Sequence, residues 1–227
     1  MKVQVIMPTA GAGSRFRSRR LKSLIPLNGA PVFIYPLKVF QKNRSIHSVI
    51  VPVPEGQVPA FSRAVKKFNL AKTVKIIPGG RTRQESVARG LEFLDDDTDF
   101  VIVHDGVRPL LSQKTLNEGL AAVKRFGAVI TAVPVKSTIK RADPADMTVA
   151  ETLERCSLWE VQTPQIFRKK ILQRAHREFK GREASDDAMM VESLKVPVKV
   201  VVGDYRNIKI TTREDLAVMK EFLRSGK

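Results

Sequence analysis

Ile6-Met-Pro-Thr-Ala-Gly-Ala-Gly-Ser-Arg15 is the stretch that decides how the rest of the chain is interpreted. It overlaps the end of Lys2–Met7, a short β-branched run that predicts a buried first strand. Gly11 and Gly13 lack a Cβ, so the backbone here can approach a ligand closely and turn its amide groups toward it. Five cations follow, namely Arg15, Arg17, Arg19, Arg20 and Lys22. Amides and cations after the carboxyl end of a strand predict a phosphate site, with a polyphosphate as its ligand.

The glycine loop matches neither of two common nucleotide-binding motifs. A dinucleotide fingerprint requires a small residue where Phe16 stands and an acidic residue about 20 positions later, and Glu55 lies too far along the chain. A P-loop ends in Gly-Lys-Ser/Thr, a triplet that this sequence lacks. The remaining pattern, Gly-x-Gly-x-Arg-(x)6-Lys from Gly11 to Lys22, is typical of nucleotidyltransferases that activate sugar phosphates and polyols. A glycine-containing turn before a solvated basic helix is the structural alternative.

The composition indicates one globular domain, residues 1–227, with a sizeable core. Hydrophobic residues make up 43% of the 227 residues. No apolar run approaches the length of a membrane span, and no secretory signal precedes Met7. Cys156 is the single cysteine, so the sequence offers no disulfide framework and no cysteine metal cluster. We therefore expect a cytoplasmic protein that does not act at a membrane.

The chain is strongly basic, with 40 Lys and Arg against 23 Asp and Glu and a formal net charge of +17. Such a charge can serve nucleic-acid binding. The cations are spread along the whole sequence, however, and two Tyr and one Trp offer few platforms for stacking bases. We therefore favour a solvated basic surface that attracts small anionic substrates over a nucleic-acid partner.

Downstream of the loop, apolar runs typical of strands alternate with segments of helical periodicity. The predicted strands are Ser48–Val53, Thr73–Ile77, Asp99–Val103, Gly127–Val133 and Val198–Val202. The predicted helices are Val32–Asn43 (with Pro31 at its start), Val58–Leu70, Thr82–Leu94, Gln113–Phe126 and Arg168–Phe179. Two further helices are predicted, one that is capped by Ser185-Asp186-Asp187 and runs to Leu194, and one that begins at Thr212. This alternation predicts an α/β fold with a mainly parallel sheet and ligands at the carboxyl ends of its strands. The glycine loop, Gly79-Gly80 and Asp105 all follow predicted strands, so we expect them to meet at one edge.

Residues 134–159 break this alternation. Val135–Arg141 and Thr148–Leu158 alternate with period two, and turn residues occupy Ala142–Asp146 between them. The pattern predicts a long hairpin outside the main sheet. Because an isolated hairpin is marginally stable, we expect this arm to pack on something, for example a second subunit.

Several motifs accompany the glycine loop along nearly the whole chain. They are Ala10-Gly-Ala-Gly-Ser-Arg15, Lys22, Gly79-Gly-x-x-Arg83-x-x-Ser86-Val87, Val103-His-Asp-Gly-Val-Arg-Pro109, Thr138-Ile-Lys140, Thr163-Pro-Gln165 and Asn207-Ile-Lys-Ile-Thr211. With these motifs the chain resembles the methylerythritol phosphate cytidylyltransferases of the non-mevalonate isoprenoid pathway. The related ribitol phosphate cytidylyltransferases share most of the motifs.

The resemblance implies transfer of a cytidylyl group from CTP to the phosphate of methylerythritol phosphate, a small branched polyol phosphate, with Mg²⁺ and with release of pyrophosphate. It also implies a Rossmann-like sheet flanked by helices, from which a β-arm protrudes to build a homodimer. Attack of one phosphate on another adds negative charge at the α-phosphorus. Positioned cations and a metal therefore carry most of the catalysis, and no covalent nucleophile is needed.

Roles for individual residues follow from the same resemblance. Asp105 matches the Mg²⁺ ligand, a role that suits a carboxylate beside phosphates. The candidate catalytic residues are Arg15 and Lys22, which steady the transition-state charge, Lys209, which positions the attacking phosphate, and Arg155, which reaches the polyol phosphate across the dimer. The candidate nucleotide-binding residues are Thr9, Ala10, Gly11, Gly13, Gly80, Arg83, Ser86 and Asp105, and the candidate substrate-binding residues are Arg108, Thr138, Thr163 and Ser185.

Alternatives remain open at this point for residues and for function. Asp105 can instead cap a helix or end a strand, and Arg108 can form a purely structural ion pair. His104 beside Asp105 invites interpretation as a metal-dependent hydrolase, although three histidines spread over the chain make a poor metal set. Ribitol phosphate or another sugar phosphate is the alternative substrate. A non-catalytic basic protein that retains the nucleotide pocket and binds RNA or an acidic partner is the alternative of another class.

The chain also departs from the family pattern. Leu21 stands where Pro is usual, Gly106-Val107 where Ala-Ala is usual, Thr9 where a second Ala is usual, and Arg206 where an Asp is common. None of these departures removes a phosphate-binding cation or the metal carboxylate. The additional arginines at positions 17, 19 and 20 have no counterpart in the pattern.

Overall fold

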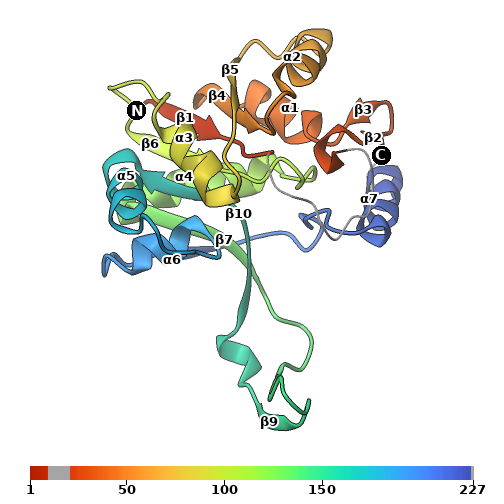
Figure 1. Cartoon of the computed structure of the whole chain (residues 1–227), viewed down its shortest axis with the longest axis vertical. Coiled ribbons are helices and arrows are strands. Elements are labelled where there is room, and N and C mark those ends of the chain that lie inside the picture. Colours follow the sequence, from red (N-terminus) through yellow and green to blue (C-terminus); the bar gives the residue numbers. More distant parts are fainter. Residues whose placement is uncertain (10–20, 226–227) are drawn as a thin grey trace.

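The computed structural model describes residues 1–9 and 21–225. Its centre is a seven-stranded sheet in the order β11-β7-β10-β6-β1-β4-β5 (Figure 1). The strands are β1 (Val3–Ile6), β4 (Ile46–Val53), β5 (Thr73–Pro78), β6 (Phe100–Val103), β7 (Ala128–Pro134), β10 (Trp159–Arg168) and β11 (Lys199–Val202). Every pairing in the sheet is parallel except the two made by β10. The predicted α/β fold with a mainly parallel sheet is confirmed.

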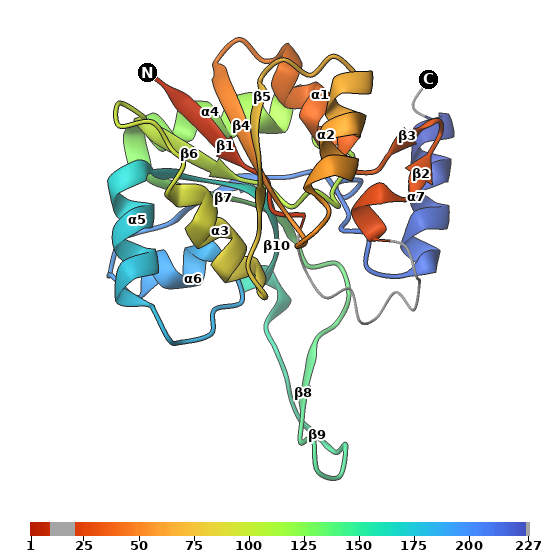
Figure 2. The same cartoon turned by 45° about the horizontal axis from the view of Figure 1, so that its top comes forward.

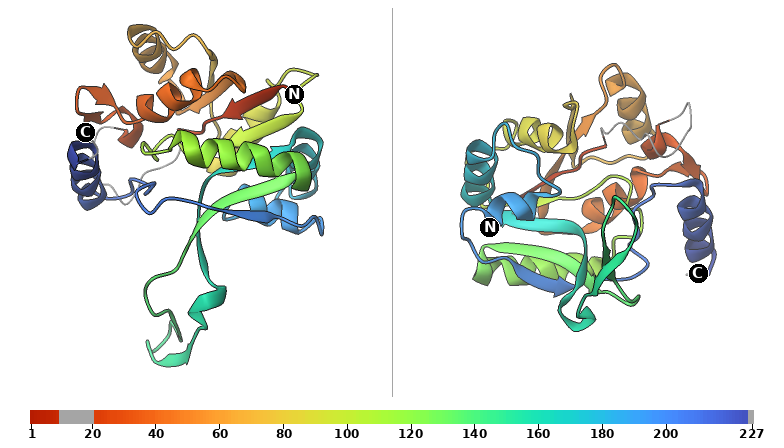
Figure 3. Two further views of the ribbon diagram at one scale, coloured as in Figure 1. Left: turned by 180° about the vertical axis from the view of Figure 1, so that it is seen from behind. Right: turned by 60° about the horizontal axis from the view of Figure 1, so that its bottom comes forward.

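Helices cover both faces of this sheet. They are α1 (Ile34–Lys42), α2 (Val58–Lys67), α3 (Arg83–Leu91), α4 (Gln113–Phe126), α5 (Lys169–Glu178), α6 (Asp187–Glu192) and α7 (Arg213–Ser225). Side chains alternate across each strand, so Phe100 and Ile102 pack with α1, α2 and α4, while Val101 and Val103 pack with α3, α5 and α6. Seen from behind, α4 runs across its face of the sheet (Figure 3). Within the described ranges, no helix combines the length and apolar character needed to cross a bilayer.

A small third core joins the C-terminal helix to an early hairpin. The hairpin pairs β2 (Pro26–Leu27) with β3 (Ala30–Pro31), and α7 lies beside it (Figure 1). The fully buried side chains of this core are Leu27, Val32, Ile210 and Met219. The predicted start of the first helix at Pro31 is therefore wrong: this proline pairs in β3, and α1 begins at Ile34.

The sequence did not lead us to expect strand β10. It enters the sheet between β6 and β7 and runs antiparallel to both. Its register shifts between Gln162 and Gln165, at the position of Pro164. A proline inside an apolar run argues against a central strand, and here it is tolerated because it sits at this irregularity.

The predicted arm is present. The chain leaves the sheet after β7 and returns at Trp159, and between them β8 (Lys140–Ala142) pairs with β9 (Val149–Thr152). This hairpin projects away from the rest of the molecule (Figure 2), and every residue of its two strands is exposed. The paired part is shorter than the two alternating segments predicted, and a 3-10 turn, Arg155–Ser157, lies on the return path.

Candidate active site

Asp105 follows β6 and is contacted by three cations of the described chain. Arg83 Nε lies 2.8 Å from Asp105 Oδ1, and Lys209 Nζ lies 2.7 Å from Oδ2. Arg108 Nε lies 3.9 Å from the same Oδ2. Arg83 begins α3, directly after the loop that follows β5, and Lys209 lies in the segment before α7, so the fold gathers these residues at the carboxyl edge of the parallel strands. Ligands bind at this edge in open α/β sheets.

The Asp105 carboxylate is buried, and the cations around it keep it ionised. Burial by itself would raise the pKa of Asp105, but the charges of Arg83, Lys209 and Arg108 outweigh this and hold the pKa well below its usual range. The side chain of Lys209 is 40% exposed whereas that of Asp105 is 7% exposed. Lys209 therefore offers its ammonium group to an incoming anion from the rim, while Asp105 lies beneath it.

The loop after β5 is built to present Arg83 as the first residue of α3. Thr82 caps this helix, because its Oγ1 accepts a hydrogen bond from Glu85 N at 3.0 Å. Gly80 N donates to Ser86 Oγ at 3.1 Å, and Ser86 Oγ donates to the carbonyl oxygen of Thr82 at 2.8 Å. A Cβ on Gly80 would lie 2.2 Å from Glu85 Cβ, so this close packing of loop on helix requires glycine.

His104 and Thr163 fix the backbone of Asp105 from behind. Asp105 N donates to Thr163 Oγ1 at 3.0 Å, Thr163 Oγ1 lies 3.1 Å from His104 Nδ1, and His104 Nε2 lies 3.1 Å from the carbonyl oxygen of Arg108. Because a carbonyl oxygen only accepts, Nε2 carries the proton and Nδ1 accepts from the threonine hydroxyl. Burial lowers the pKa of His104 to about 4, so the ring is neutral at pH 7.

The hydrolase alternative finds no support in this arrangement. Both ring nitrogens of His104 are hydrogen-bonded within the protein. Residues 1–9 and 21–225 contain no group of three or more His, Cys, Asp or Glu side chains suited to hold a metal ion. His104 is a hydrogen-bonding partner of Thr163 and of the Arg108 backbone.

The segment that carries Lys209 is fixed to β10 and to the loop after β6. Asn207 Nδ2 donates to the carbonyl oxygen of Thr163 at 2.8 Å. Arg108 Nη1 donates to the carbonyl oxygen of Asn207 at 2.7 Å. Arg108 therefore does two things at once, since it adds positive charge beside Asp105 and holds the backbone two residues before Lys209.

Lys22 approaches the same segment from another side. It begins the 3-10 helix Lys22–Leu24, and its Nζ donates to the carbonyl oxygen of Thr211 at 3.2 Å. Asp215 Oδ2 in turn accepts hydrogen bonds from Thr211 N and Thr211 Oγ1, each at 2.7 Å. The fold thus brings the two lysines predicted to be catalytic, Lys22 and Lys209, to one short segment.

A model of the 2-C-methyl-D-erythritol 4-phosphate cytidylyltransferase family matches residues 3–225. The chain belongs to this family. The enzyme of that name from Alkaliphilus metalliredigens is 42% identical over 229 aligned residues, which cover 100% of this chain and 95% of the relative. The crystal structure of the 4-diphosphocytidyl-2C-methyl-D-erythritol synthase of Anaerococcus prevotii has a TM-score of 0.85 at 30% identity and covers 98% of both chains. That of the cytidylyltransferase of Thermus thermophilus has a TM-score of 0.81 at 32% identity and covers 99% of this chain and 100% of that one.

The predicted site residues of this cytidylyltransferase fall into groups: some lie close to Asp105, some lie outside the described residues, and others lie away from Asp105. The structure brings together Lys22, Gly80, Arg83, Ser86, Asp105, Arg108, Thr163 and Lys209, through the contacts given above. Four others, Ala10, Gly11, Gly13 and Arg15, lie outside the described residues. Their roles stay predictions, and so does the nucleotide-binding role of Thr9, whose hydroxyl donates to the carbonyl oxygen of Pro52.

Thr138, Arg155 and Ser185 are not brought to Asp105 within one described chain. Thr138 and Arg155 are exposed on the arm, where Arg155 Nη1 donates to the carbonyl oxygen of Lys136 at 2.6 Å. Ser185 is exposed just before α6. No hydrogen bond or ion pair links these three side chains to the Asp105 group in the part of the chain that the structure describes.

Thr9 and Gly106, two departures of this cytidylyltransferase from its family pattern, pack against each other. Thr9 Oγ1 donates to the carbonyl oxygen of Pro52 at 3.0 Å. A Cβ on Gly106 would lie 2.5 Å from Thr9 Cγ2, closer than two carbon atoms can approach. The methyl group of Thr9 occupies the space that an alanine at position 106 would need.

Asp187 contacts Arg83 on the side away from Asp105, and His176 in turn contacts Asp187. No sequence pattern led us to expect these two contacts. The predicted cap of three residues is made by Asp186 alone, whose Oδ1 accepts a hydrogen bond from Met189 N. Asp187 turns inward, and its Oδ2 lies 2.7 Å from Arg83 Nη1. An acidic pair before an apolar run is the usual signal for a helix start, so the sequence did not distinguish the capping carboxylate from the buried one.

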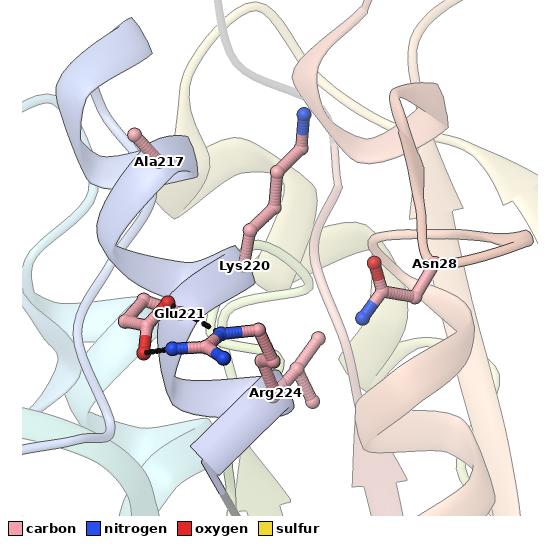
Figure 4. Close-up of a pocket in the computed structure, with 6 residues that line it drawn as sticks. Asn28, Ala217, Lys220, Glu221 and Arg224 are labelled. Carbon is pink, nitrogen blue, oxygen red and sulfur yellow. Dashed lines mark hydrogen bonds and ion pairs between the residues drawn. The ribbon is translucent and has the colours of Figure 1, made fainter.

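A pocket of about 310 Å³ lies between α7 and the loop that joins β2 to β3 (Figure 4). Its lining residues are Asn28, Ala217, Lys220, Glu221, Leu223 and Arg224. Arg224 is paired with Glu221 across one turn of α7. The pocket shares no residue with the Asp105 group, so we do not assign the reaction to it.

Proposed function

We propose that this chain transfers the cytidylyl group of CTP to 2-C-methyl-D-erythritol 4-phosphate, giving the diphosphocytidyl product and pyrophosphate. The observation that carries the proposal is the Asp105 group, in which Arg83, Arg108 and Lys209 surround one buried carboxylate at the carboxyl edge of the sheet. The substrates follow from the names of relatives that are about 40% identical over the whole chain. Cations gathered at this edge suit a reaction between two phosphates.

The reaction needs positioning and charge more than it needs a nucleophilic side chain. A phosphate oxygen of the polyol substrate attacks the α-phosphorus of CTP. The new P–O bond forms as the bond from the α-phosphorus to the bridging oxygen of the β-phosphate breaks, and pyrophosphate leaves. Lys209, exposed at the rim, binds the attacking phosphate, while Lys22, which lies against the same segment, stabilises the negative charge that grows at the α-phosphorus.

The donor set of the site fits Mg²⁺. This ion prefers oxygen ligands and is usually held by one or two carboxylates together with substrate phosphates. Asp105 supplies one ionised carboxylate, and its Oδ2 is paired with Lys209, whose side chain is 40% exposed and can be drawn away by an incoming phosphate. When bound, the ion would neutralise phosphate charge and make the α-phosphorus easier to attack.

We also propose that the active form is a homodimer in which the arm of each chain completes the site of the other. Support comes from the arm itself: every residue of its two strands is exposed, and apolar Met147 and Val149 are 76% and 60% exposed. An isolated hairpin of this kind is marginally stable. Packing across a two-fold axis would cover it and carry Thr138 and Arg155 to a neighbouring polyol phosphate. A cytoplasmic location is part of the proposal and rests on the single cysteine.

Pyrophosphate release tests the function directly. Purified protein is supplied with CTP, Mg²⁺ and either 2-C-methyl-D-erythritol 4-phosphate or ribitol 5-phosphate, with Asp105→Asn as the control variant. We expect release with the first polyol, little with the second, and a loss of about two orders of magnitude in the variant. Release with ribitol phosphate alone would assign the chain to the related activity. RNA retention that survives excess CTP, with no release from either polyol, would favour the non-catalytic alternative.

A further inference from the structure

Asp187 is fully buried, yet no step of the proposed reaction uses it. Its exposed fraction is 0%. Asp187 Oδ2 lies 2.7 Å from Arg83 Nη1, and Oδ1 lies 2.9 Å from His176 Nε2. A carboxylate buried to this degree is costly unless charged or hydrogen-bonding groups face it, and these two contacts supply them. Because the ionised carboxylate only accepts, His176 Nε2 is the donor.

Arg83 is shared between two carboxylates. Its Nε donates to Asp105 Oδ1 at 2.8 Å and its Nη1 donates to Asp187 Oδ2 at 2.7 Å. The guanidinium group is planar, so two partners on different edges fix its orientation. In that orientation Arg83 engages one oxygen of Asp105 and leaves the other, Oδ2, to Lys209.

Removing the second carboxylate would free Arg83 to rotate. An arginine beside a single carboxylate favours a bidentate pair, in which two parallel N–H groups bind both oxygens. A bidentate pair between Arg83 and Asp105 would occupy Oδ2. Oδ2 would then be held by Arg83, which is 23% exposed and also binds Oδ1, in place of Lys209, which is 40% exposed and which an incoming phosphate can draw away.

Asp187 is also held in place by groups other than Arg83. Gln165 of β10 holds the start of α6 from two sides, since its Nε2 donates to Asp186 Oδ2 at 2.7 Å and its Oε1 accepts from Ala188 N at 3.2 Å. His176 holds Asp187 from α5. Asp187 is therefore a fixed anchor, and Arg83 is the element that it orients.

We propose that Asp187 and His176 are positioning residues, which act through Arg83 to keep Oδ2 of Asp105 paired with the partly exposed Lys209 rather than with Arg83, so that the metal–CTP complex can compete for this oxygen. The inference rests on the proposed function, in which Asp105 meets that complex. Neither residue touches substrate. Their effect is on the orientation of Arg83, and through it on how readily Asp105 binds a divalent cation.

Asp187→Asn tests the proposal, with Asp186→Asn as the matched control. Both variants lose one negative charge and keep the shape of the side chain. Asparagine still caps α6 at position 186, but its NH2 group cannot accept from Gln165 Nε2, so this control also reports any effect of loosening the start of α6. The measurement is the dissociation constant of CTP by calorimetry, with Mg²⁺ and with EDTA. We expect Asp187→Asn to reduce the Mg²⁺-dependent gain in CTP affinity about tenfold, as for residues that orient a metal ligand, and Asp186→Asn to change it less than twofold.

His176 provides a second pair of variants, which decides the matter if Asp187→Asn does not fold. Glutamine can place an N–H group near the position of His176 Nε2, whereas leucine cannot. We expect His176→Gln to retain most of the Mg²⁺-dependent increase in CTP affinity. In His176→Leu, this increase should be several-fold smaller than in the wild type. Equal gains in Asp187→Asn and Asp186→Asn overturn the proposal, and so do equal gains in the two His176 variants.

Asp105→Asn, measured alongside, separates this inference from the function on which it rests. If Asp105→Asn leaves the Mg²⁺-dependent gain unchanged, Asp105 does not meet the metal and the proposed role of Asp105 fails. If the gain is lost in Asp105→Asn but retained in folded Asp187→Asn, the positioning role alone fails.

Discussion

Lys209 Nζ lies 2.7 Å from Asp105 Oδ2, while Arg83 holds the other oxygen of the same carboxylate. The ammonium group of Lys209 is thus balanced by a buried anion, although two-fifths of the side chain remains exposed. An incoming phosphate competes with Asp105 for this group. The affinity of Lys209 for the polyol phosphate therefore depends on how strongly Asp105 holds the same ammonium group.

Replacing Lys209 by Gln should separate the two substrates. Gln keeps a hydrogen-bonding side chain but loses the charge, so we expect kcat/KM for the polyol phosphate to fall by about two orders of magnitude. The dissociation constant of CTP should change little, because Arg83 and Arg108 remain beside Asp105. Steady-state kinetics and calorimetry provide the two measurements. An unchanged kcat/KM together with weaker CTP binding would contradict this assignment of Lys209.

Stability should fall as the pH drops from about 6.5 to about 4, because of His104. Burial lowers its pKa from 6.5 to about 4, so in this window the unfolded chain binds a proton that the folded chain does not. The contribution is fully present above pH 6.5 and is lost on acidification, to the extent of roughly 3 kcal/mol. Urea denaturation at several pH values measures it. His104→Gln should show a shallower pH dependence than the wild type, and parallel curves for the two proteins would show that another group is responsible.

Thr9 and Gly106 should behave as a coupled pair. Gly106→Ala alone places a methyl group against Thr9 Cγ2, at an expected cost of about 1–3 kcal/mol. Thr9→Ser removes that methyl group and keeps the hydroxyl that donates to Pro52. The double variant should therefore regain most of the stability lost in Gly106→Ala, which is a non-additive result in a double-mutant cycle. Denaturant titration of the four proteins checks this, and strictly additive effects would refute the explanation.

The arm should allow two inactive variants to complement each other. Arg155→Ala removes a residue of the arm and Lys22→Ala a residue of the main body, so a mixed dimer has one site with both defects and one with neither. After random exchange about half the dimers are mixed, and activity should recover to about a quarter of the wild-type value. Exchange is verified by mass or by a tag on one variant. No recovery despite verified exchange, or an active monomer at assay concentration, would exclude a shared site.

Local patterns predicted the parallel part of the fold well. The apolar runs at Ser48–Val53 and Thr73–Ile77 and the periodic segment Gln113–Phe126 correspond to β4, β5 and α4. The loops after these parallel strands were therefore expected at one edge, where Asp105 and Arg83 indeed meet. β10 was missed because its central proline resembles a turn, and the antiparallel entry that accommodates it depends on β6 and β7, which lie far away in sequence.

The contacts of Asp187 and His176 could not be predicted from the sequence, for a related reason. Both belong to helices whose starts were predicted from local signals, and those signals say nothing about which side chain turns inward. The contact of Asp187 with Arg83 joins α6 to α3, and it exists because both helices cover the same face of the sheet. Buried ion pairs between distant elements follow from packing, which a single sequence does not display.

β10 has a consequence for how homologous chains can vary in length. It joins the arm to the site, since Trp159 pairs with Pro134 at the base of the arm and Thr163 Oγ1 accepts a hydrogen bond from Asp105 N. An inserted residue in the turn at 143–148 would change only an exposed hairpin tip. One inserted between Trp159 and Thr163 would shift the register by one and turn Thr163 away from Asp105. Natural relatives should therefore differ freely in length at the tip of the arm, and should preserve the spacing from Trp159 to Thr163.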